Sequence, residues 1–139
     1  MTATLSPQID QIASLLASQG YDVSQDGPDV QNVREVRSGI SVRAVLEGQI
    51  VFFTMPCMTV PSKEITADLM KKMLAAENGI STSHFQLYDA PDGSVIITLN
   101  NFCKLQDMGS EDEDDILSCV HFLLADVIAA RDLLQGAAK

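Results

Sequence analysis

The sequence has few basic residues and no tryptophan. Only 9 lysines and arginines stand against 19 aspartates and glutamates, which gives a formal net charge of −10. A protein that binds nucleic acid along the phosphate backbone needs clustered lysine and arginine side chains, so this charge argues against a nucleic-acid partner. Anionic membrane surfaces also repel a protein with this net negative charge.

Long apolar runs are also missing. No stretch approaches the roughly 18 consecutive apolar residues that a membrane-spanning helix needs, so we expect no membrane insertion. Residues 1–7 lack the basic start and the apolar run of a signal peptide. We therefore expect a cytoplasmic protein.

Cysteine is limited to Cys57, Cys103 and Cys119, an odd number without Cys-x-x-Cys spacing. This pattern favours buried thiols in a reducing compartment over disulfides or a metal site. The acidic run over residues 111–115 does not change this interpretation. Adjacent acids on a helix point in different directions, and they complement the positive end of the helix dipole without any ion. We expect no metal and no cofactor.

Catalytic signatures are absent as well. The chain has no glycine-rich nucleotide loop, no Gly-x-Ser-x-Gly and no His-Glu-x-x-His. Of the two histidines, His121 follows Cys119 by two residues, about 200° around a helix, so the two do not face each other. A reactive pair would have to come from different elements, such as Cys103 with His121 or His84. We predict that the protein is not an enzyme. The alternative is an enzyme or small-ligand sensor that uses Cys103, Cys119 or His121 in a pocket.

The length of 139 residues predicts one domain over residues 1–139. Apolar spacing predicts a first helix over 7–19, which Ser6 caps and Gly20 ends. The polar residues 24–29 are typical of a loop. Three strands are expected at 30–37, 40–46 and 50–55, with Pro56 and Pro61 at the end of the third. The first of these alternates poorly, which an edge position would explain.

A second helix is predicted over about 62–77 with Ser62 as its cap, and strands at 84–88 and 94–99 flank a tight turn at 90–93. The segment 102–105 continues the last strand. Ser110 and Glu113 have capping-box spacing at the start of a long final helix. Its apolar stripe also contains Arg131, which either reaches past the helix end or pairs with an acid. The sequence thus predicts an α+β fold in the order α-β-β-β-α-β-β-α. In this predicted fold, three helices are expected to pack on a mostly antiparallel five-stranded sheet.

The middle helix has an apolar arc wider than one sheet covers. Ile65, Leu69 and Met73 mark one side of it, and Met70 and Leu74 mark the other. An exposed apolar side of this size is unusual in a monomer. We predict that these five residues form the interface of a homodimer.

The element order resembles the class I type III secretion chaperones and the YbjN-like proteins. The local similarity lies in Phe85 to Asp89, the turn Pro91-Asp92-Gly93, the strand Ser94 to Leu99 and the acid-capped closing helix. YjfI-type bacterial proteins are similar in the same region. The resemblance implies a bacterial homodimer, built through the middle helix, that binds an extended segment of another protein along its first helix and sheet. We therefore predict a non-catalytic, chaperone-like or adaptor-like domain, and the sequence does not identify the partner protein.

Overall fold

The computed structural model describes residues 8–80 and 82–137, and these residues form two compact units. Unit 1 comprises residues up to Thr54 together with Phe102–His121, and unit 2 comprises Met55–Asn101 together with the residues from Phe122 onward. Three elements, two strands and the last helix, contribute residues to both units. The single domain over residues 1–139 stays a prediction.

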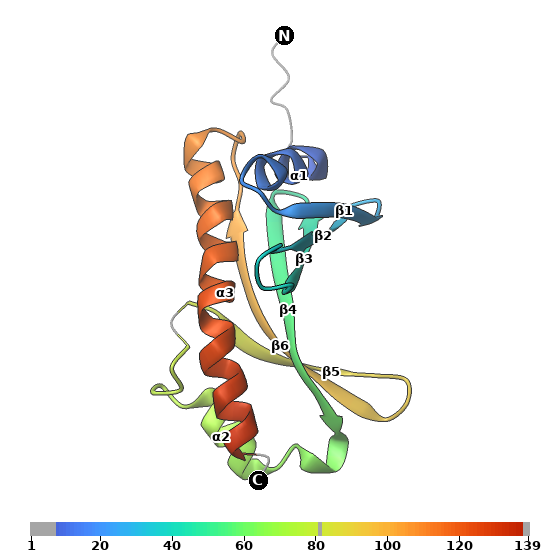
Figure 1. Cartoon of the computed structure of the whole chain (residues 1–139), viewed down its shortest axis with the longest axis vertical. Coiled ribbons are helices and arrows are strands. Elements are labelled where there is room, and N and C mark those ends of the chain that lie inside the picture. The colour runs from blue at the N-terminus through green and yellow to red at the C-terminus, as the bar shows by residue number, and fades with distance from the viewer. Residues whose placement is uncertain (1–7, 81, 138–139) are drawn as a thin grey trace. The chain divides into compact units, whose positions relative to one another are not determined.

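The fold is α+β, as predicted. The elements, labelled in Figure 1, are α1 (Ile9–Ser18), β1 (Asp22–Gly27), β2 (Val30–Arg34), β3 (Ser41–Glu47), β4 (Ile50–Pro61), a 3-10 turn (Ser62–Glu64), α2 (Ala67–Leu74), β5 (His84–Asp89), β6 (Ser94–Lys104) and α3 (Ser110–Ala137). The strands hydrogen-bond in the order β1-β2-β3-β4-β6-β5. The sheet therefore has six strands, and the predicted number of five is wrong.

The additional strand is β1, which occupies most of the predicted loop over residues 24–29. It pairs antiparallel with β2 from Asp22–Arg34 to Gly27–Val30 and has no neighbour on its other side. An edge strand with polar, exposed side chains lacks the apolar alternation by which strands are recognised. Because β1 takes the edge, β2 lies inside the sheet, contrary to the prediction.

In unit 1 the core lies beneath α1, which contacts β1 and β2. The helix buries Ile9, Ile12 and Leu16 at helical spacing. At its start the Gln8 backbone N–H donates to Oε1 of Gln11 at 2.9 Å. The predicted cap Ser6 lies outside the described residues.

In unit 2 the second helix is shorter than predicted. The Thr66 hydroxyl accepts a hydrogen bond from the Leu69 N–H at 3.1 Å, so α2 begins after Thr66, and Ser62 starts only a 3-10 turn. Strand β4 is longer than predicted and passes through Pro56 to Pro61. Its pairing with β3 ends at Arg43–Thr54, so Pro56, which has no N–H, lies beyond that ladder.

The hairpin between β5 and β6 has the predicted tight turn. The Ala90 N–H donates to the Ser94 carbonyl at 2.9 Å, and Oδ1 of Asp92 accepts from the Ser94 N–H and hydroxyl. The predicted stripe of α3 is mostly buried, whereas Ile128 is 67% exposed and Arg131 is exposed. Among the residues that the structure describes, no helix is long and apolar enough to cross a membrane.

Candidate functional site

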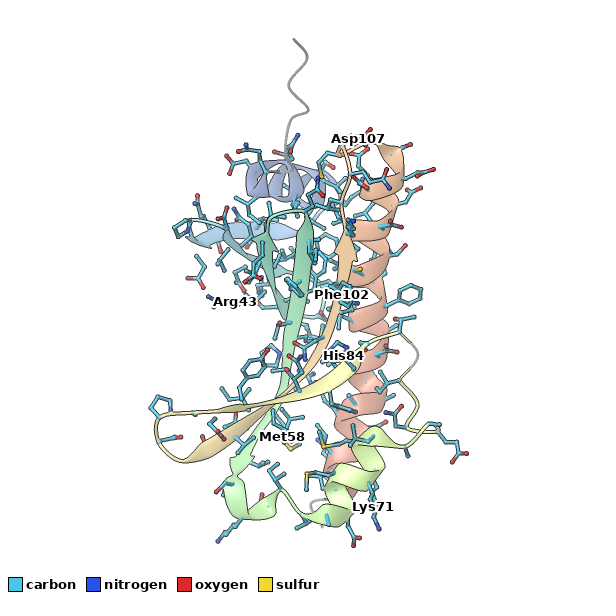
Figure 2. All side chains as sticks on the ribbon, turned by 180° about the vertical axis from the view of Figure 1, so that it is seen from behind. Arg43, Met58, Lys71, His84, Phe102 and Asp107 are labelled. Atoms are coloured by element: carbon cyan, nitrogen blue, oxygen red, sulfur yellow. The ribbon has the colours of Figure 1, made fainter. Side chains whose placement is uncertain are left out.

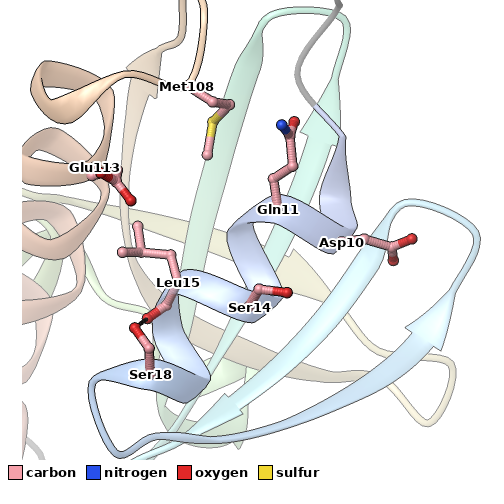
Figure 3. A pocket seen from close by; sticks show the side chains of 7 residues that line it. All are labelled: Asp10, Gln11, Ser14, Leu15, Ser18, Met108 and Glu113. Carbon is pink, nitrogen blue, oxygen red and sulfur yellow. Dashed lines mark hydrogen bonds between the residues drawn. The ribbon is translucent and has the colours of Figure 1, made fainter.

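A groove of about 510 Å³ lies at the surface of unit 1 between α1 and the beginning of α3 (Figure 3). One wall is α1, which contributes Asp10, Gln11, Ser14, Leu15 and Ser18. The other wall is Met108, from the loop before α3, together with Glu113 of α3. The groove thus combines apolar side chains with carboxylates.

The loop that carries Met108 is held by one buried carboxylate. Asp112 is only 4% exposed, and its Oδ2 accepts the backbone N–H groups of Gln106 at 2.7 Å and Met108 at 2.8 Å. Met108 has a φ of +59°, which side chains other than glycine rarely adopt. The two hydrogen bonds therefore fix a strained residue as one wall of the groove.

The predicted capping box at this helix start is not found. Ser110 is the first helical residue, and the Glu113 N–H donates to the Gly109 carbonyl at 3.0 Å. Asp112, from the acidic run, is the residue that satisfies backbone donors here. No group of three or more potential ligands for a metal ion occurs within residues 8–80 and 82–137.

Two exposed phenylalanines form a second apolar feature of unit 1. Phe52 of β4 is 37% exposed, Phe102 of β6 is 57% exposed, and their ring centroids are 6.0 Å apart. Phe52 pairs with Val45 of β3, and the next pair on the same face contains Arg43 (Figure 2). Arg43 forms an ion pair with Asp26 at 3.2 Å. This is a partly exposed aromatic surface on a sheet face.

Two of the three cysteines, Cys103 on β6 and Cys119 on α3, influence each other's ionisation. Hydrogen bonding between the two side chains is the largest cause: it raises the pKa of Cys103, where burial adds to the effect, and it lowers the pKa of Cys119, where burial opposes it. His121 is exposed and is not among the groups that shift the pKa of either thiol, so the pairing of Cys103 with His121, which the alternative enzyme would need, gains no support.

Cys57 lies in unit 2, beside the core cluster, without a thiol neighbour among the groups that influence it. Burial raises the pKa of its thiol to about 11, and the nearby Arg131 lowers it only in part. His84 and Tyr88 are both exposed on one face of β5.

A buried carboxylate in unit 2 was not predicted. Asp126 of α3 is 5% exposed, and its Oδ2 accepts a hydrogen bond from the Ser83 hydroxyl at 2.9 Å. Its position beside Val127, at the border of the apolar stripe, is the only sequence signal that could have indicated burial. The interaction ties α3 to the segment before β5.

The five residues predicted for a dimer interface separate into two groups. Leu69 and Met73 are buried in a core cluster with Val60, Ile97 and Leu134, and Ile65 packs against that cluster. Met70 is 40% exposed and Leu74 is 78% exposed. Of the five predicted residues, these two expose apolar surface on α2, and the interface itself stays a prediction.

The fold, with helices packed on an antiparallel sheet, is similar to that of two solved structures. The chain is similar in structure to YbjN of E. coli, a proposed transcription regulator, with a TM-score of 0.66 and 13% identity over 96% of this chain and 97% of that one. It is also similar to a chain of the heterodimeric ExoU–SpcU complex from the type III secretion system of Pseudomonas aeruginosa. That TM-score is 0.59, with 16% identity over 90% of this chain and 98% of the other.

These similarities confirm the predicted fold. No protein-family model matches the sequence, and no curated protein sequence matches it. The similarity therefore concerns the fold alone.

Proposed function

We propose that this protein is a non-catalytic, chaperone-like or adaptor-like protein of the bacterial cytoplasm that binds an extended segment of another polypeptide. The observation that carries the proposal is the groove beside α1 in unit 1. The fold supports it, because a chain of similar structure occurs in a heterodimeric protein complex. Our proposal places the partner segment in this groove.

The side chains of the groove define the chemistry of the partner. Asp10 and Glu113 provide two carboxylates, whereas none of the described residues that line the groove is a lysine or an arginine. Leu15 and Met108 provide the apolar part of the lining, and the flexible methionine side chain adapts to different partner side chains. A segment with lysine or arginine next to an apolar side chain fits this lining, and the net charge of −10 favours the same partner.

Site-specific photo-crosslinking in the native cell tests the proposal. A benzophenone amino acid replaces Ser14 in the groove, and the control replaces Ser118, an exposed serine of α3 that does not line the groove. We expect a discrete adduct from position 14 and none from position 118. Mass spectrometry should locate the crosslink in a basic, apolar segment of the partner.

Charge reversal in the groove provides a second test of the proposed site. Asp10→Lys combined with Glu113→Lys should remove the adduct, because like charges then face the basic segment. The same double change at Asp114 and Asp132, which are exposed and do not line the groove, should leave the adduct in place. Equal adducts from positions 14 and 118, or none from position 14, would overturn the proposed site.

A catalytic thiol–histidine pair has no geometric support. His121 is exposed, and Cys103 and Cys119 act on each other instead.

A further inference from the structure

The sequence contains one Asn-Gly pair, Asn78-Gly79, and this pair lies in unit 2 shortly after the end of α2. Both polar atoms of the Asn78 carboxamide are held by the backbone. Its Nδ2 donates a hydrogen bond to the Met73 carbonyl at 2.6 Å, and its Oδ1 accepts one from the Ile80 N–H at 2.9 Å. The Asn78 side chain thus clamps the end of α2 to the segment that follows it.

The bond to Met73 satisfies part of a helix end. The last carbonyl groups of an α-helix have no partner within the helix, and Met73 is the residue before the last in α2. The Met73 side chain is only 4% exposed and belongs to the unit 2 core. The Asn78 N–H also donates to the Ala75 carbonyl at 3.1 Å, so the chain turns back on the helix at this point.

The same carboxamide can react with the backbone beside it. The Gly79 nitrogen attacks Cγ of Asn78 and loses its proton, the bond from Cγ to Nδ2 breaks, and ammonia leaves a cyclic imide. Water then adds to either carbonyl carbon of the imide, the ring opens, and the product is aspartate or isoaspartate. Water is the co-reactant, and no electrons are transferred. Glycine favours ring closure because no side chain hinders its nitrogen, and Gly79 is exposed to water.

The fold opposes ring closure. The leaving group is Nδ2, so its hydrogen bond to Met73 must break before ammonia can leave. The carboxamide must also be free to turn its carbon toward the Gly79 nitrogen, and the hydrogen bond from Ile80 holds Oδ1 in place. A Cβ at Gly79 would lie 3.5 Å from Cβ of Ala129, so α3 flanks the turn. Reaction therefore requires local opening of this segment.

We propose that Asn78-Gly79 is a latent deamidation site, which the fold protects through the two hydrogen bonds of the Asn78 carboxamide and which converts to aspartate or isoaspartate when the end of α2 opens. Because the ammonia is lost, the product does not revert, and the reaction leaves a covalent record of the opening. The inference is independent of the proposed partner binding, because the groove belongs to unit 1.

The product weakens the end of α2. Aspartate has no Nδ2 to donate to the Met73 carbonyl, and its carboxylate places negative charge beside the negative end of the helix dipole. Isoaspartate adds a carbon to the backbone and shifts the side chain away from the Ile80 N–H. Each product favours the open segment, so deamidation stabilises the state from which it arises.

Peptide mapping by mass spectrometry tests the site. The full chain is incubated at mildly alkaline pH with and without urea, and aspartate and isoaspartate at position 78 are quantified. We expect conversion in urea and a rate at least about tenfold lower in the folded chain, because only the open fraction reacts. Gly79→Ala should slow conversion in urea, where the positive φ of residue 79 is not required. Equal rates with and without urea, or no conversion in urea, would contradict the proposal.

The hydrogen bond from Ile80 allows a test in the folded chain. Ile80→Pro removes the N–H that holds Oδ1, so conversion without urea should become severalfold faster. Ile80→Val is the matched control, because it keeps the N–H and should react at the wild-type rate. A folded Ile80→Pro chain that reacts no faster would show that this bond does not protect Asn78. If Ile80→Pro fails to fold, the comparison of the wild type with and without urea still decides the matter.

Asn78→Asp reproduces one product and tests its effect on the fold. This variant should unfold at a lower urea concentration than the wild type, because the Met73 carbonyl loses its donor. Gln49→Glu makes the same change in charge at an exposed amide in the turn after β3, and its unfolding midpoint should match the wild type. Equal midpoints for Asn78→Asp and the wild type would refute the weakening of α2.

Discussion

At the residue scale, burial raises the pKa of all three thiols, but other groups add to this effect or oppose it. Cys57 has a raised pKa, mainly because the partly buried site disfavours the thiolate, and Arg131 offsets this only in part. The folded pKa of about 11 lies above the ordinary value of 9.0. The protonated thiol therefore contributes stability below pH 9, and this contribution is lost as the pH rises from 9 to about 11.

The reactivity of Cys57 should reflect this shift. In the variant Cys103→Ser with Cys119→Ser, Cys57 is the remaining thiol, and its labelling by iodoacetamide can be followed by mass spectrometry. At pH 8 the folded chain should react about 100-fold more slowly than the chain in urea, since each pKa unit changes the thiolate fraction about tenfold. The rate should reach its midpoint near pH 11. A midpoint near pH 9 in the folded chain would contradict the prediction.

We predict that removal of the Asp112 carboxylate lowers the stability of the protein, because this group holds the loop beside the groove. In Asp112→Ala the backbone N–H groups of Gln106 and Met108 lose their acceptor. Leaving such donors unsatisfied costs about 1–3 kcal/mol, so urea unfolding should show a loss of stability of that size.

Asp114→Ala is the matched control for this change. Asp114 belongs to the same acidic run, its removal changes the charge equally, and it is exposed. Its effect should stay within about 0.5 kcal/mol, as is usual for exposed positions. Equal losses of stability in the two variants would show that the acidic run acts through its charge and not through the two hydrogen bonds.

At the scale of elements, the parts that the sequence predicted well are those with local signals. Strand β3 alternates apolar and polar residues, and the turn at 90–93 contains Pro91, Asp92 and Gly93, whose conformations suit it. The stripe of α3 also follows a local period. Such patterns need no information about neighbouring elements.

The elements that were predicted wrongly depend on competition between local alternatives. Ser62 and Thr66 are both suitable caps, and only the packing of Leu69 and Met73 on the unit 2 core selects Thr66. Strand β1 is polar because one of its edges is open, so its backbone hydrogen bonds to β2 define it and its side chains do not.

The site residues were harder to predict than the elements, because they meet across the sequence. Asp126 and Ser83 are 43 residues apart. Cys103 and Cys119 lie on a strand and a helix whose relative register the sequence does not encode in any spacing rule. The contact of Asp112 with the loop before α3 could only be seen in three dimensions.

At the scale of the whole molecule, the exposed apolar residues of α2 bear on whether two copies of the chain associate. Met70 and Leu74 are four residues apart, so they lie one turn apart on the same side of the helix. The adjacent side is already occupied, because Leu69 and Met73 are buried in the unit 2 core. Met70 and Leu74 are the large apolar side chains that α2 exposes, and the same surface of a second copy can cover them.

We therefore predict a homodimer through α2. Light scattering at micromolar concentration should give twice the chain mass of 15.0 kDa for the wild type, and 15.0 kDa for Met70→Asp with Leu74→Asp. The control Lys71→Asp with Lys72→Asp changes exposed residues of the same helix and should remain dimeric. Circular dichroism should show that both double variants are folded, since none of the four side chains is buried. A monomeric wild type would refute the dimer, and a dimeric Met70→Asp/Leu74→Asp variant would place the interface away from α2.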